Sequence, residues 1–534
     1  MNKIEALKTE CDGLDVKASI AGYATTGWES ISEEDIQRLK WYGLFLRNLT
    51  PGYFMIRVRI SGGKTGSYQL RALAGIAQEY GNGILDLTTR QQIQLRQIRI
   101  EHVPAIFAKL EEVGLTSLQT GMDNVRNVMT CPVAGLTPDE MLDATSAVQA
   151  ITQEILENRE YTNLPRKVNI AVTGCLDNCL HMETQDLALV PAYQGEGEAK
   201  ITGFNVLAGG KLGSGGYRIA SPLDIFVLPS ESLEVCRAIM LLYRDHGPRE
   251  TRTAARLAFL LDDWGVARFR SEVEAKVGHP LARAGTDARK TGEKDHVGIY
   301  RQKQPRMNYV GLKVVVGRIT AKDLVAVAAL AEKYGTGDVR LSPAQAIIIP
   351  NVVDRLVSDL TEEPLVKRLT YNPAPIHKGL VSCVGNDYCN LAVIETKSRA
   401  VETAKALEVK LGSGIKPITM HWSGCPAGCG NHLVADIGLL GKKTKIDGKV
   451  VDAVDVFVGG RSGIDPKLAM KIMEDVPCDK LPSVLEGLVP YHTREKMHRV
   501  RGAETRKTAL AVKPESTAGS SLAGFIAPSV LKPA

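Results

Sequence analysis

The feature that most constrains the fold of this chain is an internal repeat. Residues 54–95 align with residues 308–349 without a gap, at an offset of 254 (335 − 81). The matched pairs include Gly63/Gly317, Leu70/Leu324, Tyr80/Tyr334, Gly81/Gly335, Gly83/Gly337, Leu87/Leu341 and Gln91/Gln345. Two copies at so long a period are typical of a duplicated domain rather than of a solenoid. The sequence therefore predicts a molecule with pseudo-twofold symmetry.

Each copy has the pattern of a β-α-β-β unit. In the first copy, apolar residues alternate over 56–60, which predicts a strand, and recur at helical spacing over 70–77. A second strand over 84–88 and a third strand complete the unit, and a further helix is expected near 104–113. The second copy repeats this pattern, with its first strand running to Val316. The expected fold is α+β, with two ferredoxin-like half-domains.

The repeat resumes later in each half, at an offset of 250 (425 − 175). TGCLDNC at 173–179 matches SGCPAGC at 423–429. The same register holds for Asp186/Asp436, Leu189/Leu439, Gly209/Gly459 and Gly210/Gly460. We therefore expect a larger α/β domain after each half-domain. The predicted segments are an N-terminal extension at 1–50, a half-domain at 51–120, a larger domain at 121–282, a polar linker at 283–306, the second half-domain at 307–370, the second larger domain at 371–507 and a tail without fixed structure at 508–534.

Composition places the chain among soluble globular proteins. With 534 residues it is long enough for three or four domain-sized units, and 44% hydrophobic and 24% charged residues are ordinary values. Aromatic residues at 5% argue against a base-stacking nucleic-acid surface. No apolar run approaches the ~20 residues that a membrane helix needs, and the N-terminal segment has no apolar core of a signal peptide. We expect a cytoplasmic protein without a membrane or nucleic-acid partner, although a removed plastid-type transit peptide would leave no trace.

Four cysteines of the second half form two close pairs, Cys383/Cys389 and Cys425/Cys429. Their loops, SCVGNDYC and SGCPAGCG, contain glycine, so the backbone can wrap closely around a compact inorganic cluster. A structural zinc site is an alternative, but zinc ligands usually come as C-x2-4-C pairs, which the first spacing does not fit. Unligated core cysteines are another alternative. Clustered cysteines in a chain of this length favour a cluster and a reducing compartment.

The stretches SCVGNDYCNLAVIETK and HWSGCPAGCGNH resemble the signature of the ferredoxin-type nitrite and sulfite reductase family, and the resemblance covers roughly residues 35–500. It implies that Cys383, Cys389, Cys425 and Cys429 hold a [4Fe-4S] cluster. It also implies that Cys429 bridges to the iron of a sirohaem. The larger domain at 121–282 would then bind sirohaem and substrate, and that at 371–507 would bind the cluster and sirohaem.

Three cysteines of the first half correspond, in the repeat, to cluster cysteines of the second half: Cys131, Cys175 and Cys179. No cysteine answers Cys389. A site with three thiolates is incomplete, so we expect no second cluster. The three residues are interpreted as relics, as core residues or as a redox pair, and relic or core packing is the preferred interpretation.

Three basic blocks of the first half, TTRQQIQLR, MDNVRN and NLPRKVN, also resemble blocks of the family. By matching position, they place Arg90, Arg126, Lys167 and Asn169 on the distal face of the haem. There the resemblance implies that they bind the substrate anion, polarise its N–O bonds and relay protons. A single Arg or Lys is usually a solvated surface charge, but three blocks in family order argue otherwise. Family sulfite reductases tend to carry Lys-x-Lys where this chain has Lys167-x-Asn169, and one fewer ammonium suits nitrite, a monoanion.

Further candidates to pair with haem carboxylates are Arg59, Lys64, Lys211, Arg218 and Arg461. The last three lie in or beside the glycine-rich stretches GGKLGSGG and GGRSG, which are equally consistent with ordinary turns. GSGG at 213–216 is no dinucleotide fingerprint, so no flavin or NAD(P)H module is apparent. The resemblance implies reduced ferredoxin, an acidic protein, as the electron donor. The net charge of +6 suits such a partner but also an anionic substrate or cofactor.

The expected function is the six-electron reduction of nitrite to ammonium by a monomeric enzyme. Assimilatory sulfite reduction on the same architecture is the closest alternative. A tetrapyrrole-modifying relative such as precorrin-3B synthase is more distant. A non-catalytic iron–sulfur electron carrier belongs to another class, and it would need no distal basic residues such as Arg90, Arg126 and Lys167.

Overall fold

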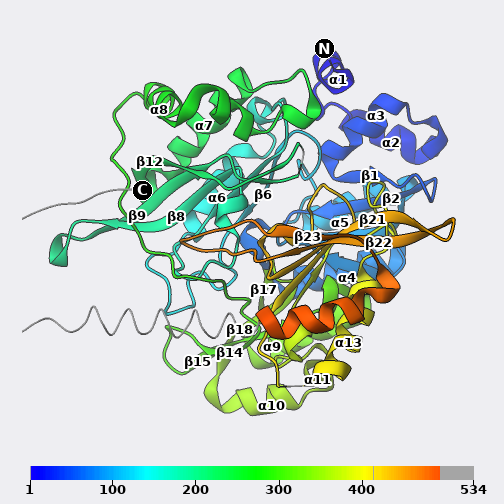
Figure 1. Ribbon diagram of the computed structural model, residues 1–534. Coiled ribbons are helices and arrows are strands. Elements are labelled where there is room, and N and C mark those ends of the chain that lie inside the picture. Colours follow the sequence, from blue (N-terminus) through cyan, green and yellow to red (C-terminus); the bar gives the residue numbers. More distant parts are fainter. Residues whose placement is uncertain (1, 214, 413, 493–534) are drawn as a thin grey trace, which may run out of the picture.

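The computed structural model describes residues 2–213, 215–412 and 414–492 (Figure 1). Strands of the described residues form four sheets of five or six strands and one two-stranded hairpin. Helices cover these sheets. The predicted α+β class is confirmed. The predicted tail at 508–534 lies outside the described residues, as does the end of the segment 371–507.

The N-terminal extension docks onto the first larger domain. Its helices are α1 (Lys3–Glu10), α2 (Lys17–Thr26) and α3 (Glu33–Arg38). The ammonium of Lys8 donates to the carbonyl of Leu164 at 2.8 Å and lies 3.4 Å from the carboxylate of Asp123. The indole of buried Trp41 donates to the carbonyl of Thr162 at 3.1 Å. The extension is therefore an integral part of the fold.

The two half-domains have matching elements. The first contains β1 (Leu44–Leu46), β2 (Tyr53–Val58), β3 (Lys64–Gly66), α4 (Ser67–Tyr80), β4 (Ile84–Leu87), β5 (Ile93–Arg99) and α5 (Val103–Glu112). The second contains β14 (Gly298–Arg301), β15 (Met307–Lys313), β16 (Arg318–Thr320), α9 (Ala321–Tyr334), β17 (Asp338–Ser342), β18 (Ala346–Val353), α10 (Val357–Glu362) and α11 (Pro364–Leu369). The duplication inferred from the repeat is confirmed.

The half-domains exchange short strands. The first sheet has the order β1-β2-β5-β4-β16, and the second has the order β14-β15-β18-β17-β3. Ile319 of β16 therefore pairs with Leu85 of β4, while Thr65 of β3 pairs with Val339 of β17. The antiparallel pairing joins the two half-domains into one body, with a single hydrophobic core that spans both.

The first strand of each copy is shorter than the sequence predicted. We expected it to run to Ile60 and Val316, but β2 ends at Val58 and β15 ends at Lys313. In both copies a short 3-10 turn follows, with left-handed backbone at Gly62 (φ +58°) in the first copy and at Val316 (φ +50°) in the second. These turns redirect the chain into the exchanged strands.

The two larger domains also share one topology. The first has the order β12-β9-β8-β7-β6 and the second has the order β19-β20-β21-β22-β23. The first contains β6 (Val125–Met129), α6 (Thr145–Ile155), β7 (Val168–Val172), β8 (Leu187–Gln194), β9 (Ile201–Ala208), the hairpin strands β10 (Lys211–Leu212) and β11 (Tyr217–Arg218), β12 (Ser221–Val227), α7 (Ser232–His246) and α8 (Leu257–Val277). The second contains α12 (Pro375–Lys378), β19 (Gly379–Ser382), α13 (Lys397–Leu411), β20 (Thr419–Ser423), β21 (Ile437–Ile446), β22 (Lys449–Val458) and β23 (Met470–Pro477). In each sheet, three neighbouring strands are parallel: β6, β7 and β8, and β19, β20 and β21.

The segment 283–306, which connects the halves, has structure of its own. It contains β13 (Thr286–Asp287), which pairs with β8, and β14, which opens the second half-domain. Its ammonium groups form ion pairs with the first larger domain: Lys290 lies 2.7 Å from Asp139, and Lys294 lies 3.2 Å from Asp177. The polar residues that suggested a linker therefore hold the segment against the protein.

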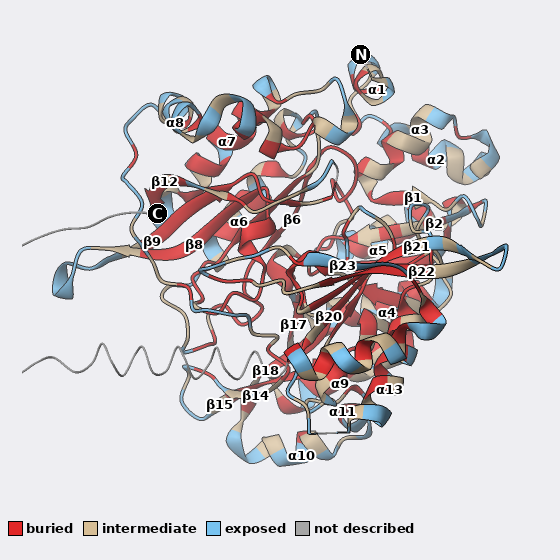
Figure 2. Cartoon of the chain, viewed as in Figure 1, coloured by how far each residue is buried: buried red, intermediate tan, exposed pale blue. Residues whose placement is uncertain are grey.

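Buried residues gather on the facing sides of the helices and sheets in each domain (Figure 2). One cluster of charged groups in this interior centres on Asp86. Asp86 of β4 lies 2.7 Å from Arg96, 3.1 Å from Arg318 of the exchanged strand β16 and 3.3 Å from Lys397 of α13. This ion cluster joins the half-domains to the second larger domain. Among the described residues, no helix is long and apolar enough to cross a bilayer.

Candidate active site

The four cysteines of the second half lie at the carboxyl ends of two neighbouring parallel strands. Cys383 follows β19, and Cys425 follows β20. Carboxyl ends of parallel strands meet at one edge of a sheet, where ligands of open α/β sheets bind. Backbone groups donate to the sulfurs: the N–H of Gly424 to Cys383 at 3.1 Å, and that of Leu391 to Cys389 at 3.4 Å. Because the loop N–H groups donate to these sulfurs, the loops hold the two sulfurs in fixed positions.

Cys429 differs from its neighbours in its electrostatic surroundings. Burial raises the pKa of the Cys383 thiol, and it raises that of Cys425 to about 12. Burial acts in the same direction on Cys429, but the positive charges of Arg90, Lys167 and Arg57 outweigh it and lower the pKa of this thiol. Its side chain is exposed, and its chain neighbour Gly428 lines a cavity together with Arg90 and Lys167.

The cavity beside Cys429 is built by both halves of the chain. Its lining residues are Thr89, Arg90, Lys167, Asn169, Thr184, Gln185, Leu212, Arg256, Ala427, Gly428 and Asn431. All but the last three come from the first half. The hydroxyl of Thr89 donates to the backbone carbonyl of Cys429 at 2.9 Å, which fixes the two halves to each other at the site.

Lys167 and Asn169 enter this cavity at the beginning of β7. The backbone N–H of Asn169 donates to the carboxylate of buried Asp186 at 2.7 Å, and the guanidinium of Arg256 grips the same carboxylate through two bonds of 2.7 Å. This network positions the strand. Burial, with Arg90 and Arg256 nearby, holds the pKa of Lys167 well below its ordinary value. The side-chain oxygen of Asn169 is buried and has no hydrogen-bond partner.

Arg126 lies deeper than Arg90. It belongs to β6, and its guanidinium donates to the carbonyls of Thr120 and Met122. Its Nε is buried without a partner. Burial, together with the charges of Arg57 and Arg90, lowers the pKa of Arg126 well below its usual range. Arg126 therefore adds positive potential behind the residues that line the cavity.

The other basic candidates are engaged in protein contacts. Lys211 is buried and donates to the carbonyl of Gly215 at 2.9 Å, and Arg218 donates to the carbonyl of Ala258 at 2.7 Å. The guanidinium of Arg461 lies 2.5 Å from the carboxylate of Asp465. None of these three lines the cavity at Cys429.

Two weaker candidates also point elsewhere. Arg59 is buried and donates to backbone carbonyls, among them those of Arg126 at 2.9 Å and Gln119 at 3.1 Å. It therefore shapes the loop before β6. Lys64 is exposed on the exchanged strand β3.

Sequence reasoning missed three residues of this region: Thr89, Arg57 and Arg256. Arg57 is partly buried on β2, where desolvation and the charge of Arg90 lower its pKa to about 9. Arg256 could not be predicted from the sequence, because it lies in no recognisable motif. The one available signal was its partner Asp186, which is preserved in the repeat as Asp436. An acid kept at the same position of both copies predicts a partner without saying which residue supplies it.

The site fits the two groups that the resemblance implies. Four thiols at one sheet edge suit an iron–sulfur cluster. The buried, unpartnered Nε–H of Arg126 is a free donor and suits an anionic ligand beside it. Gly213 and Gly428 allow the β10–β11 hairpin to cover the cysteine loop closely, since a Cβ on Gly213 would lie 2.5 Å from the carbonyl oxygen of Ala427. Cys429 therefore lies between the cysteine cluster and the basic cavity.

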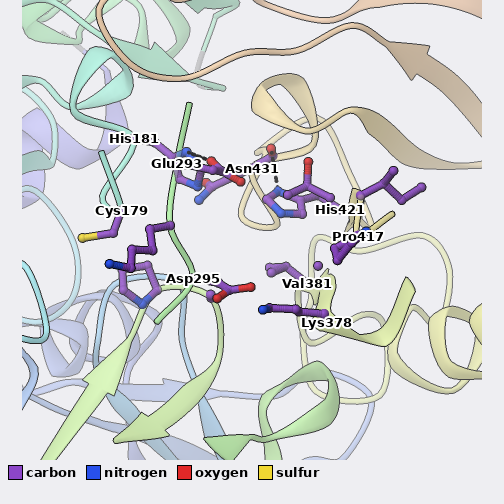
Figure 3. Close-up of a pocket in the computed structure, with 15 residues that line it drawn as sticks. Cys179, His181, Glu293, Asp295, Lys378, Val381, Pro417, His421 and Asn431 are labelled. Atoms are coloured by element: carbon purple, nitrogen blue, oxygen red, sulfur yellow. Dashed lines mark hydrogen bonds and ion pairs between the residues drawn. The ribbon is translucent and has the colours of Figure 1, made fainter. Parts of the chain in front are cut away.

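A second, larger cavity is the pseudo-twofold counterpart of the first (Figure 3). It has a volume of about 140 Å³. At the repeat offsets, Cys179 stands where the first cavity has Cys429, but Ala344 replaces Arg90, Pro417 replaces Lys167 and Thr419 replaces Asn169. This second cavity thus lacks counterparts of Arg90 and Lys167, although Lys294 and Lys378 line it, and we assign the anion chemistry to the cavity beside Cys429.

Comparisons with known proteins agree with this arrangement. Residues 121–281 and 378–507 match the family description "nitrite and sulphite reductase 4Fe-4S domain", and residues 48–113 and 300–366 match "nitrite/sulfite reductase ferredoxin-like half domain". A ferredoxin–nitrite reductase of Synechococcus elongatus is 45% identical, over 92% of this chain and 96% of its own length.

Two further relatives are informative. An assimilatory ferredoxin-dependent nitrite reductase of Haloferax mediterranei is 38% identical, over 97% of this chain and 93% of its own. The solved structure of the Mycobacterium tuberculosis NirA protein superposes with a TM-score of 0.85 at 31% identity, covering 90% of this chain and 91% of that one.

Proposed function

The chain belongs to the nitrite and sulfite reductase family, and from this membership we propose that it is a ferredoxin-dependent nitrite reductase of nitrate assimilation. It catalyses the reaction NO2⁻ + 8 H⁺ + 6 e⁻ → NH4⁺ + 2 H2O. The resemblance seen in the cysteine loops is confirmed. The observation that carries the proposal is a cavity beside Cys429 that Arg90, Lys167 and Asn169 line, with Arg90 and Lys167 close enough to lower the pKa of the Cys429 thiol.

The enzyme uses a [4Fe-4S] cluster and sirohaem. We assign the cluster to Cys383, Cys389, Cys425 and Cys429, with Cys429 also next to the haem. When bound, these groups supply stored electrons and an iron centre for a small oxyanion. Lys211, Arg218 and Arg461 remain predicted partners of haem carboxylates. For Arg218 and Arg461 this role requires the present contacts with Asp262 and Asp465 to open.

The first half supplies positive charge and protons. Arg90 and Arg126 attract the nitrite anion and offset the charge that collects on its oxygens. The ammonium of Lys167 is a stronger acid than that of a free lysine, because burial and the neighbouring Arg90 and Arg256 lower its pKa. It can therefore give a proton to a departing oxygen and regain one. Arg256 and Asp186 act as positioning residues.

Asn169 favours nitrite over sulfite. Nitrite carries one negative charge, whereas sulfite near neutrality is largely a dianion. A neutral amide beside Lys167 provides hydrogen bonding without a second positive charge. Assimilatory sulfite reduction is therefore the less favoured function.

A competition experiment tests the substrate. The purified enzyme, supplied with reduced viologen, should turn over nitrite in preference to sulfite. The Asn169→Lys variant should raise the rate with sulfite relative to that with nitrite, because it adds a cation. An enzyme that reduces sulfite but not nitrite would contradict the proposal.

The proposal extends to the partner and location. Reduced ferredoxin supplies the electrons, and the enzyme acts as a monomer in the cytoplasm without a membrane or nucleic-acid partner. Light scattering of the purified protein should give the mass of a single chain. Cell fractionation should recover the activity in the cytosolic fraction rather than with membranes.

A further inference from the structure

The three cysteines of the first half repeat the geometry of the cluster loops. Cys131 follows β6 and Cys175 follows β7, as Cys383 follows β19 and Cys425 follows β20. The backbone contacts repeat as well. In all four cases the N–H two residues further on points to the sulfur, at Val133, Asp177, Gly385 and Ala427 respectively. These loops are therefore built to hold sulfur ligands, not only to fill space.

A fourth ligand comes from another part of the chain. No cysteine answers Cys389, but His296 of the connecting segment is fully buried beside Cys131. Its Nε2 lies 3.7 Å from the Cys131 sulfur, and its Nδ1 lies 3.2 Å from the hydroxyl of Tyr309. A metal-binding histidine has this arrangement, with one ring nitrogen toward the metal and the other held by a hydrogen-bond partner.

The spacing of the ligand atoms suits one small ion. The sulfurs of Cys131 and Cys179 and the ring nitrogen of His296 all lie within 4.8 Å of one another. Cys175 contacts the Cys131 sulfur but lies outside this close group, so its thiol would shift to reach the ion as a fourth ligand. With Zn–S bonds of about 2.3 Å, sulfurs of a zinc tetrahedron lie about 3.8 Å apart. Among the described residues, the cysteines assigned to the iron–sulfur cluster form no group this close.

We propose that Cys131, Cys175, Cys179 and His296 bind a single structural Zn²⁺ ion. A closed tetrahedral Cys3His set is a zinc site without an open position for substrate. The ion would join the first larger domain to the connecting segment, close to the point where the two halves meet. This site is independent of the nitrite chemistry, and the four ligands take no part in it.

Charge and access are consistent with such an ion. His296 is fully buried, and its Nδ1 faces the Tyr309 hydroxyl, which leaves Nε2 to face the sulfur of Cys131. Zn²⁺ with three thiolates leaves one negative charge. The buried guanidinium of Arg340 lies near Cys131, and its Nε has no hydrogen-bond partner. Cys179 lies in the wall of the second cavity, which gives the ion a route inward.

Metal analysis of the intact enzyme tests the proposal. Elemental analysis should find one zinc per chain beside the iron of the two cofactors. Zinc K-edge absorption should report three sulfur neighbours at about 2.3 Å and one nitrogen at about 2.0–2.1 Å. Absence of zinc from protein made in zinc-replete medium, another metal in its place, or an oxygen-rich shell would overturn it.

Two ligand variants and one control variant test which residues bind the ion. His296→Ala and Cys179→Ser should each bring zinc to background while iron content and the visible spectrum persist. Cys236→Ser removes a cysteine buried in the core of the same larger domain, and it should keep the zinc. Zinc retained in both ligand variants would contradict the assignment. Should a variant fail to fold, the absorption measurement on the unaltered enzyme still decides.

Discussion

At the scale of single residues, neighbouring titratable groups of this enzyme have pKa values that are shifted in opposite directions. Cys425 and Cys429 lie four positions apart, yet burial raises the pKa of one thiol and surrounding cations lower that of the other. Lys167 is one of those cations, and its own pKa is lowered by burial. Residues with strongly shifted pKa values around one cavity are typical of active sites.

Lys167→Ala should therefore slow nitrite reduction while both cofactors stay bound. A positioned proton donor contributes roughly 10²- to 10⁴-fold to a rate, and we expect a loss in that range. Viologen-driven turnover measures the rate, and the visible spectrum reports the cofactors. Lys64→Ala, on an exposed strand residue, is the matched control and should be neutral. Turnover at the unaltered rate in Lys167→Ala would remove Lys167 from the mechanism.

Cys429→Ser should abolish nitrite reduction, because it removes the thiolate assigned both to the cluster and to the contact with the haem. Iron and acid-labile sulfide per chain should fall as well. Cys478→Ser, a buried cysteine in the core of the same domain, should leave activity and iron intact. Full activity in the Cys429 variant would exclude its assigned role.

At the scale of elements, the exchanged strands and the Asp86 cluster hold the halves together. The sequence predicted the helices and the longer strands, because apolar periodicity marks them. It could not predict the exchange, since β3 and β16 are three residues long and their partners lie in the other half. In the same way, cysteine spacing revealed the cluster loops, whereas Arg57 and Arg256 reach the site only through tertiary packing.

Asp86→Asn should destabilise the fold by about 3–5 kcal/mol, because it leaves Arg96, Arg318 and Lys397 buried with too little negative charge. Denaturant unfolding followed by circular dichroism measures this. Glu362→Gln breaks an exposed ion pair with Lys367, and it should cost no more than about 1 kcal/mol. Equal effects in the two variants would contradict a stabilising role for the cluster.

The Asp86 effect should also depend on pH in a defined direction. Its carboxyl is buried, which alone would raise its pKa, but Lys397, Arg96 and Arg318 lower the pKa below that of an unfolded aspartate, about 3.9. The stabilisation is therefore complete above about pH 4 and declines as the pH falls further. The stability difference between the unaltered protein and Asp86→Asn should shrink in that acid range.

At the scale of the whole molecule, a duplicated architecture has divided its tasks. The second half holds the four cysteines that we assign to electron transfer, and the first half contributes the basic residues that we assign to the anion and the protons. The counterpart cavity keeps Cys179 but has Ala344 and Pro417 in place of cations. The spacing of the cysteines in the sequence already showed that the first half lacks a complete set of four. The presence of His296 beside the remaining three followed only from the fold.

Ferredoxin-driven turnover should be more sensitive to salt than viologen-driven turnover. Attraction between a protein of net charge +6 and an acidic donor is screened as ionic strength rises, with a Debye length of about 8 Å near 0.15 M. We expect the KM for ferredoxin to rise with salt while viologen-driven kcat changes little. The same salt response with both donors would argue against electrostatic docking.

The reaction stoichiometry of the purified holoenzyme tests the central claim most directly. The visible spectrum should show chlorin-like absorption. With reduced viologen as donor, each nitrite consumed should yield one ammonium and oxidise six one-electron equivalents. A protein without that absorption, or one that leaves nitrite unchanged while reducing sulfite, would contradict the account.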